Sequence, residues 1–200
     1  MNDRTIRPET REEQTDIRQA AAEQRREEQA AALHARFDFR DIRPEEAGEA
    51  YELELVCFPP NEACTEKQIR ERVIAVPDLF LTAIDRENGR MAGYLTGIAT
   101  DCPDFRDDFF TDVTTHEPEG QNVMLLSLNV RPEYRRQGLA RELIAEFRRR
   151  EEARGRRRLV LTCHDAKVAM YARMGFRDLG LSASVWGGGS WHEMELILNP

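Results

Sequence analysis

The chain lacks several features that define common classes of protein. No apolar run in its 200 residues approaches the roughly 20 that a membrane-spanning helix needs, so we expect no membrane partner. Residues 1–10 lack the apolar core of a secretory signal, and we expect no signal peptide. Only four cysteines are present and none forms a CxxC pair. We therefore expect neither a disulfide framework nor a metal site, and a cytoplasmic protein.

Basic residues are also fewer than acidic ones. The chain has 29 Lys and Arg residues against 37 Asp and Glu residues, which gives a formal net charge of −8. Because binding to bulk nucleic acid needs a basic face, we expect no nucleic-acid partner. A negative field instead attracts cationic small molecules. Hydrophobic residues make up 40% of the chain, which is enough for a core, while the 33% of charged residues imply a segment that is nearly all surface.

Residues 1–36 differ from the rest of the chain, because they are rich in Arg, Glu, Gln and Ala. Helix propensity is high there, yet the apolar stripe is mostly alanine. We predict a helical extension from about Glu9 to Ala35, followed by a globular domain over residues 37–200. The helix is either simply solvated or packed on a partner subunit, and the protein is expected to be a monomer or a homodimer.

From residue 37 onward, strand and helix patterns alternate. The predicted strands are residues 37–42, 79–84, 91–99, 122–130, 159–162, 176–186 and 191–198. The predicted helices begin at Pro44, Thr65, Gln137 and Asp165. The inner face of the first of them is predicted to carry Ala47, Ala50, Leu53 and Val56. Residues 101–121 form a long acidic loop, and loops of this length are usually functional or mobile.

One strand–loop–helix segment carries a chemical signal. After the aliphatic strand, a short loop leads into a helix that starts at the small residues Gly138 and Ala140, so backbone N–H groups can approach a ligand closely. A helix N-terminus binds anions, and Arg135 and Arg136 add positive charge. The segment predicts a phosphate or pyrophosphate site or, alternatively, an ordinary turn with a packing glycine. Neither of the common glycine-rich nucleotide loops is present.

Two motifs resemble those of a known family. Arg135-x-x-Gly138-x-Ala140 resembles the pyrophosphate loop of the GNAT superfamily of N-acetyltransferases, and the segment from Tyr171 to Gly175-Phe176 is similar to the Tyr-x-x-x-Gly-Phe of that family. The resemblance covers about residues 37–198. It implies an α/β fold with a central mixed, mostly antiparallel sheet of about seven strands flanked by helices.

Further stretches resemble the arylalkylamine (serotonin-type) subfamily. They are Cys163-His164-Asp165-Ala166 before the tyrosine helix, Phe58-Pro59-Pro60-Asn61, and residues 116–120. Polyamine acetyltransferases share much of this pattern. That subfamily carries two histidines on the central strand, where this chain has Met124 and Leu126. Another group must therefore accept the proton of the amine, and the candidates are a water chain, His116 and His164, of which we favour His164.

The resemblance implies acetyl-CoA as the cofactor and assigns residues to it. Backbone groups of Leu128, Asn129 and Val130 would bind the pantetheine arm. The pyrophosphate would be held by Arg135, Arg136, Gln137, Gly138, Leu139, Ala140 and Arg141. Tyr171 would protonate the leaving thiolate, because a phenol and a thiol have similar pKa values; alternatively it is a core tyrosine. The amine would attack the thioester directly, so no nucleophilic cysteine is needed.

The expected acceptor is a small primary amine, either an arylalkylamine or a polyamine or diamine. The candidate substrate residues are Phe58, Pro59, Pro60, Thr162, Asp104 and Asp108. The aromatic residues Phe105, Phe109 and Phe110 interleave with the acidic residues of the loop, while Trp186 and Trp191 either pack across strands or form a platform for the substrate. The alternatives are an acyl-CoA-binding regulatory module without turnover, and an enzyme that acetylates proteins or peptides.

Overall fold

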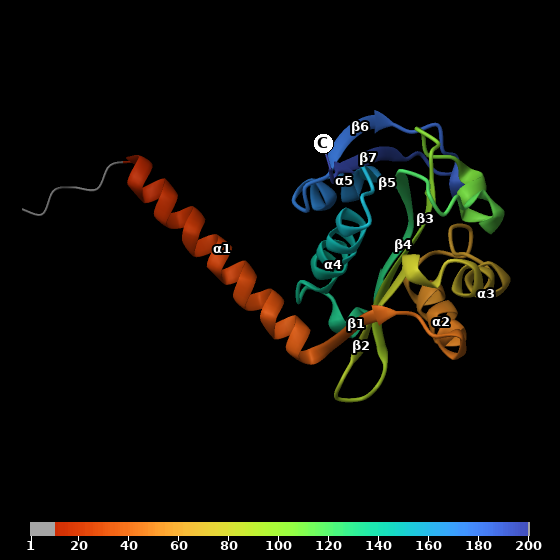
Figure 1. Ribbon diagram of the computed structural model, residues 1–200, viewed down its shortest axis with the longest axis horizontal. Coiled ribbons are helices and arrows are strands. Elements are labelled where there is room, and N and C mark those ends of the chain that lie inside the picture. The colour runs from red at the N-terminus through yellow and green to blue at the C-terminus, as the bar shows by residue number, and fades with distance from the viewer. Residues whose placement is uncertain (1–10, 200) are drawn as a thin grey trace, which may run out of the picture.

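A seven-stranded sheet organises the fold in the computed structural model, which describes residues 11–199 (Figure 1). The strands are β1 (Phe37–Asp41), β2 (Phe80–Asp85), β3 (Met91–Thr100), β4 (Asn122–Val130), β5 (Arg158–Cys163), β6 (Arg177–Leu181) and β7 (His192–Ile197). Their order across the sheet is β1-β2-β3-β4-β5-β7-β6. β4 and β5 run parallel, and every other neighbouring pair is antiparallel. The mixed, mostly antiparallel sheet predicted from the sequence is thus confirmed.

Helices lie on both sides of this sheet (Figure 1). Within residues 11–199 the α-helices are α1 (Arg11–Arg36), α2 (Ala47–Cys57), α3 (Glu66–Ala75), α4 (Leu139–Ala153) and α5 (Asp165–Ala172). The predicted capping box at the start of α3 is present, since the Thr65 N–H donates to Gln68 Oε1 at 2.8 Å and the Gln68 N–H donates to Thr65 Oγ1 at 3.3 Å. Across the described part of the chain, no helix combines the length and apolar character needed to cross a bilayer.

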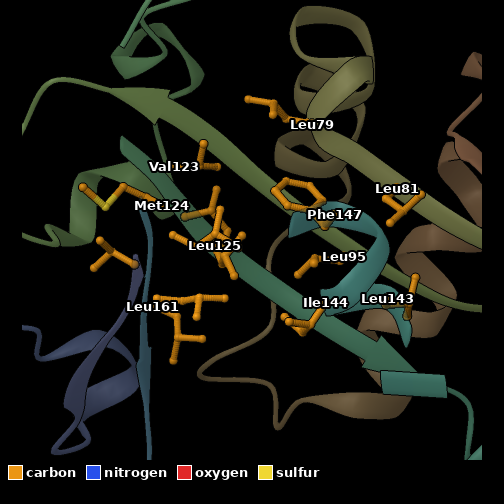
Figure 2. Close-up of a cluster of buried hydrophobic side chains, with 14 of the residues drawn as sticks. Leu79, Leu81, Leu95, Val123, Met124, Leu125, Leu143, Ile144, Phe147 and Leu161 are labelled. Carbon is orange, nitrogen blue, oxygen red and sulfur yellow. The ribbon is translucent and has the colours of Figure 1, made fainter. Parts of the chain in front are cut away.

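The larger of two buried clusters joins β4 and β5 to α4 (Figure 2). The predicted inner face of α4 is buried there, with Leu139, Leu143, Ile144 and Phe147 at helical spacing and arginines on the outer face. Phe147 is only 1% exposed. Truncating such a side chain to alanine typically costs about 3–5 kcal/mol. The packing of this face therefore holds the first turn of α4, and the loop before it, against the sheet.

β4 and β5 pair along only part of their length. Their register runs from Asn122↔Arg158 to Leu125↔Leu161 and then stops. At that point β4 contains a β-bulge, because the register with β3 skips Leu126. A bulge bends a strand and increases its local twist. The two parallel strands therefore separate beyond Leu126, although both stay paired with their other neighbours.

The connection between β6 and β7 differs from the prediction of two long strands around a glycine turn. β6 ends at Leu181 and β7 begins at His192, and after the Ser182 N–H donates to the Trp191 carbonyl at 2.8 Å, residues 183–190 leave the sheet. The cause is a contact with the acidic loop, because the Asp107 carboxylate accepts from Ser184 Oγ at 2.5 Å and from the Val185 N–H at 3.0 Å. These bonds replace the predicted strand pairing.

The acidic loop itself is folded onto the core. Phe105, Phe109 and Phe110 are buried, which ties the loop to the larger cluster. Glu117 Oε2 accepts from Thr100 Oγ1 at 2.8 Å and from the Asp101 N–H at 2.6 Å, so the end of β3 is capped by the loop. Residues 101–121 thus have a fixed conformation despite their lack of long helices or strands.

Helix α1 stands away from the sheet for most of its length (Figure 1). Its last turns alone reach the domain: Leu33 is buried, His34 Nε2 lies 2.8 Å from Glu142 Oε1, and Arg36 donates to Asp85 at 3.1 Å. The predicted start of this helix at Glu9 lies outside the described residues. The helix ends at Arg36 and β1 begins at Phe37.

Candidate active site

A cavity of about 870 Å³ opens where β4 and β5 separate. One wall comes from the second half of β4, the loop after it and the first turn of α4. The opposite wall comes from the end of β5 and from α5, and the loop after α2 and residues 186 and 191 close one end. Cavities of 300–1,000 Å³ are typical of small-molecule and cofactor sites.

Most of the predicted site residues line this cavity. They are Phe58, Pro59, Leu128, Asn129, Val130, Arg135, Arg136, Gly138, Leu139, Ala140, Arg141, Thr162, His164 and Tyr171. Five predicted site residues do not: Pro60, Asp104, Asp108, His116 and Gln137. The structure thus gathers two motifs and two loops, far apart in the sequence, around one space.

The residues that stay outside the cavity are engaged elsewhere. His116 Nδ1 accepts from the Ala99 N–H at 3.1 Å, and burial lowers the pKa of His116. Asp108 pairs with Arg106 at 2.6 Å, and Asp104 is exposed on the surface. The acidic loop therefore contributes Phe110 to the cavity rather than its carboxylates.

The start of α4 forms a cradle of backbone donors. Gly138 and Arg136 adopt left-handed conformations, with φ of 95° and 60°, which turn the chain sharply into the helix. The first bond into α4 runs from the Glu142 N–H to the Gly138 carbonyl at 3.1 Å, so the three N–H groups before it have no acceptor within the helix. These donors, the helix dipole and the guanidinium groups of Arg136 and Arg141 suit a diphosphate. The residues present therefore fit the cofactor that the resemblance implies.

The free edge of β4 faces the same cavity. Since pairing with β5 stops at Leu125, the backbone groups of residues 127–130 that point away from β3 face no neighbouring strand. Arg135 Nε donates to the Val130 carbonyl at 2.9 Å and fixes the end of this edge to the loop. An amide-containing arm such as pantetheine can pair with an open strand edge in this way.

Tyr171 lies on the wall formed by α5. Its ring contacts the Phe176 ring edge-on, with the ring centroids 5.7 Å apart. This contact forms because Gly175, with φ of 99°, ends the helix and turns the chain back toward Tyr171. Burial raises the pKa of Tyr171, so the phenol keeps its proton at neutral pH. Burial likewise raises the pKa of the neighbouring Cys163 thiol to about 11. Burial thus favours the protonated form of both groups.

A buried carboxylate in the cavity wall was missed by the sequence analysis. Glu54 of α2 is 1% exposed, and the predicted inner-face residue Val56 is 51% exposed instead. The Glu54 oxygens accept from four donors: Tyr94 Oη at 2.5 Å, Asn129 Nδ2 at 2.7 Å, the Cys64 N–H at 3.0 Å and Ser127 Oγ at 3.3 Å. Four hydrogen bonds offset the cost of burying the charge. The spacing of Glu54 from Ala47 and Ala50 was the available signal, because all three share one helical face.

The other end of the cavity is aromatic. Trp186 stacks on Phe110 with centroids 4.7 Å apart, and Trp191 stacks on His164 at 4.0 Å. Glu62 joins the two pairs, since its carbonyl accepts from Trp186 Nε1 at 2.9 Å and its carboxylate lies 3.1 Å from His164 Nε2. All five side chains line the cavity. Trp186 and Trp191 are therefore positioned at the cavity rather than paired across strands.

The structure also shows where the residues at the paired-histidine positions and at the start of α5 lie. Of the positions that match the paired histidines, Leu126 lines the cavity, whereas Met124 is fully buried in the core (Figure 2). At the start of α5, His164 occupies the N-cap position, while the predicted cap Asp165 is the first helical residue. The Asp165 carboxylate lies 3.6 Å from His192 Nε2.

Comparisons with known proteins agree with this architecture. The family model described as "Acetyltransferase (GNAT) family" matches residues 47–176. Serotonin N-acetyltransferase of Mesocricetus auratus is 27% identical over 165 residues, which cover 80% of this chain and 77% of that protein.

Solved structures share the fold at low sequence identity. The loading GNATL domain of CurA from Lyngbya majuscula has a TM-score of 0.71 at 16% identity, covering 81% of this chain and 98% of that one. A phosphinothricin acetyltransferase from Sinorhizobium meliloti, solved with acetyl-CoA, has a TM-score of 0.60 at 18% identity, covering 82% of this chain and 89% of that one. The match to the family model includes both the donor cradle and Tyr171. The chain belongs to the GNAT family of acetyltransferases, whose members take their acetyl group from acetyl-CoA.

Proposed function

We propose that this protein transfers the acetyl group of acetyl-CoA to a small primary amine, either an arylalkylamine or a diamine. The observation that carries the proposal is the composition of the cavity wall, where stacked aromatic rings adjoin the Glu62 carboxylate and the buried Glu54 carboxylate also lines the cavity. Rings and carboxylates together bind an organic ammonium ion. The 27% identity to a serotonin N-acetyltransferase supports an amine acceptor.

The size of the acceptor is limited by contacts between two segments that adjoin the cavity. Asn61 Nδ2 donates to the Gly187 carbonyl at 2.7 Å, and Trp186 Nε1 donates to the Glu62 carbonyl at 2.9 Å. These bonds join the loop after α2 to the segment before β7. This bridge favours a small molecule over a peptide, because an extended peptide needs an open groove.

Acetyl-CoA supplies an activated thioester, and the side chains of the protein manage the protons around it. The start of α4 and the free edge of β4 hold the cofactor, and Tyr171 donates a proton to the leaving thiolate. Glu54 accepts the proton of the amine through Ser127, which lines the cavity and whose hydroxyl donates to Glu54 Oε1 at 3.3 Å. A hydroxyl can accept one hydrogen bond while it donates another, so it can relay a proton. His164 is the weaker candidate, because its Nε2 already lies against Glu62.

A turnover screen tests the proposal. The protein with acetyl-CoA should release thiol in the presence of arylethylamines or short diamines and not with peptides. Tyr171→Phe should lose turnover by about 10²- to 10⁴-fold while binding CoA normally, because only a proton donor is removed. Normal CoA binding without turnover on any amine would instead favour the regulatory acyl-CoA-binding module. Turnover on peptides alone would favour the protein acetyltransferase.

A further inference from the structure

The anchored end of α1 touches the loop that the cofactor needs. The Gln29 side chain lines the cavity and donates from Nε2 to the Gln137 carbonyl at 3.0 Å. It lies directly over Gly138, where a Cβ would come within 2.8 Å of Gln29 Nε2. Because Gly138 has no side chain, the Gln29 amide can lie directly beside the cradle.

Neighbouring contacts hold the end of α1 against each part of this loop. His34 bonds Glu142 in the first turn of α4. The Arg36 guanidinium lies over the ring of Tyr134, which precedes the loop, at 5.4 Å. Arg36 also donates to the buried Asp85 carboxylate. The lead-in, the turn and the start of α4 are therefore all contacted by one helix, which fixes where the Gln29 amide sits.

We propose that Gln29 is part of the cofactor site and donates a hydrogen bond to the diphosphate of coenzyme A, so that α1 completes the cradle. A glutamine amide carries two N–H donors. One of them is used on the Gln137 carbonyl, and that bond holds the amide at the edge of the cavity with its second donor free to turn inward. A neutral amide adds a donor to a cradle already built of backbone N–H groups. The inference rests on the proposed cofactor use and extends it to a residue outside the family-model match, which begins at residue 47.

Two substitutions at one position test the proposal by calorimetric titration with CoA. Gln29→Glu keeps the shape of the side chain but replaces the donor by a carboxylate, which repels a diphosphate. It should weaken CoA binding by more than tenfold, and Gln29→Ala should weaken it by about tenfold, as expected for one hydrogen bond to a charged group. The matched control is Gln24→Ala, because Gln24 lies on the same helix and bonds only Glu28 one turn away, at 3.0 Å.

The same titrations with 3′-dephospho-CoA identify the group that is bound. Equal losses with both ligands support contact with the diphosphate, whereas a loss seen only with CoA would assign Gln29 to the 3′-phosphate and overturn the proposal. Unchanged or tighter CoA binding by both Gln29 variants would also overturn it. Failure of the unmodified protein to bind CoA would remove the proposed function itself. Gln29 is exposed, so circular dichroism should show all variants folded.

Discussion

Replacement of Glu54 by glutamine separates its proposed role in catalysis from its role in folding. If Glu54 accepts the proton of the amine, Glu54→Gln should lower kcat by about 10²- to 10⁴-fold, the usual contribution of a general base. CoA affinity should change little, because glutamine keeps the shape of the side chain and Glu54 makes no hydrogen bond to residues 135–141 of the cradle.

The surroundings of Glu54 show why the amide should be tolerated. Glu54 Oε2 accepts from Tyr94 and Asn129. A phenol can reverse its hydrogen bond, and the buried Asn129 Oδ1, which has no partner among the described residues, can accept from an amide if Asn129 turns over. The cost should therefore be about 1–3 kcal/mol, the loss of charge-assisted bonding. Glu54→Ala would leave four donors unpaired, at about 1–3 kcal/mol each, and is a poor test.

Three measurements on the same preparation decide the question. Thiol release gives kcat, calorimetry gives the CoA affinity, and urea unfolding gives the stability. Glu49→Gln is the matched control: Glu49 is on the same helix and is hydrogen-bonded to the Met91 N–H at 2.9 Å, but it does not line the cavity. A loss of kcat below about tenfold in Glu54→Gln would refute the role of Glu54 as proton acceptor.

Two further changes test the acceptor end and the acidic loop. Trp186→Leu should raise KM for an arylalkylamine about two- to tenfold, because the stacking on Phe110 is lost, while KM for an aliphatic diamine changes less; equal shifts would argue against an aromatic subsite. His116→Gln should reduce the dependence of stability on pH. Because burial lowers the pKa of His116, the unfolded chain binds more protons than the folded one, and stability falls as the pH falls below the unfolded value of 6.5. Urea unfolding at pH 7.5 and pH 5.0 measures this, and the idea fails if the variant and the unmodified protein lose equal stability.

Local patterns in the sequence were sufficient for most of the elements and for one half of the cavity lining. The bounds of β4 and the capping box of α3 follow from hydrophobic spacing and from residues a few positions apart. The donor cradle is likewise local, because a strand, a short loop and a helix start are contiguous in the chain. Tyr171 was recognised from the adjacent Gly175-Phe176, whose glycine must adopt a positive φ.

The acceptor half of the site could not be read in the same way. Glu54 sits on a helix that looks merely amphipathic, and its importance comes from Tyr94, Ser127 and Asn129, which lie 40 to 75 residues away. The acidic loop looked like an ammonium site by composition. Its phenylalanines bury themselves in the core instead, and its Asp107 draws residues 184–185 out of the sheet.

The sequence by itself determined the order of most elements, the glycine turn at the start of α4 and the position of Tyr171 before Gly175-Phe176, because each depends on backbone preferences and nearby residues. Only the tertiary structure decided that β4 and β5 separate at Leu126, that Glu54 is buried beside the resulting cavity, and that Gln29 reaches Gly138 from a helix 109 positions earlier. Those features arise from packing between distant segments. Such packing is set by the shape of the whole fold and leaves no periodic signal in the chain.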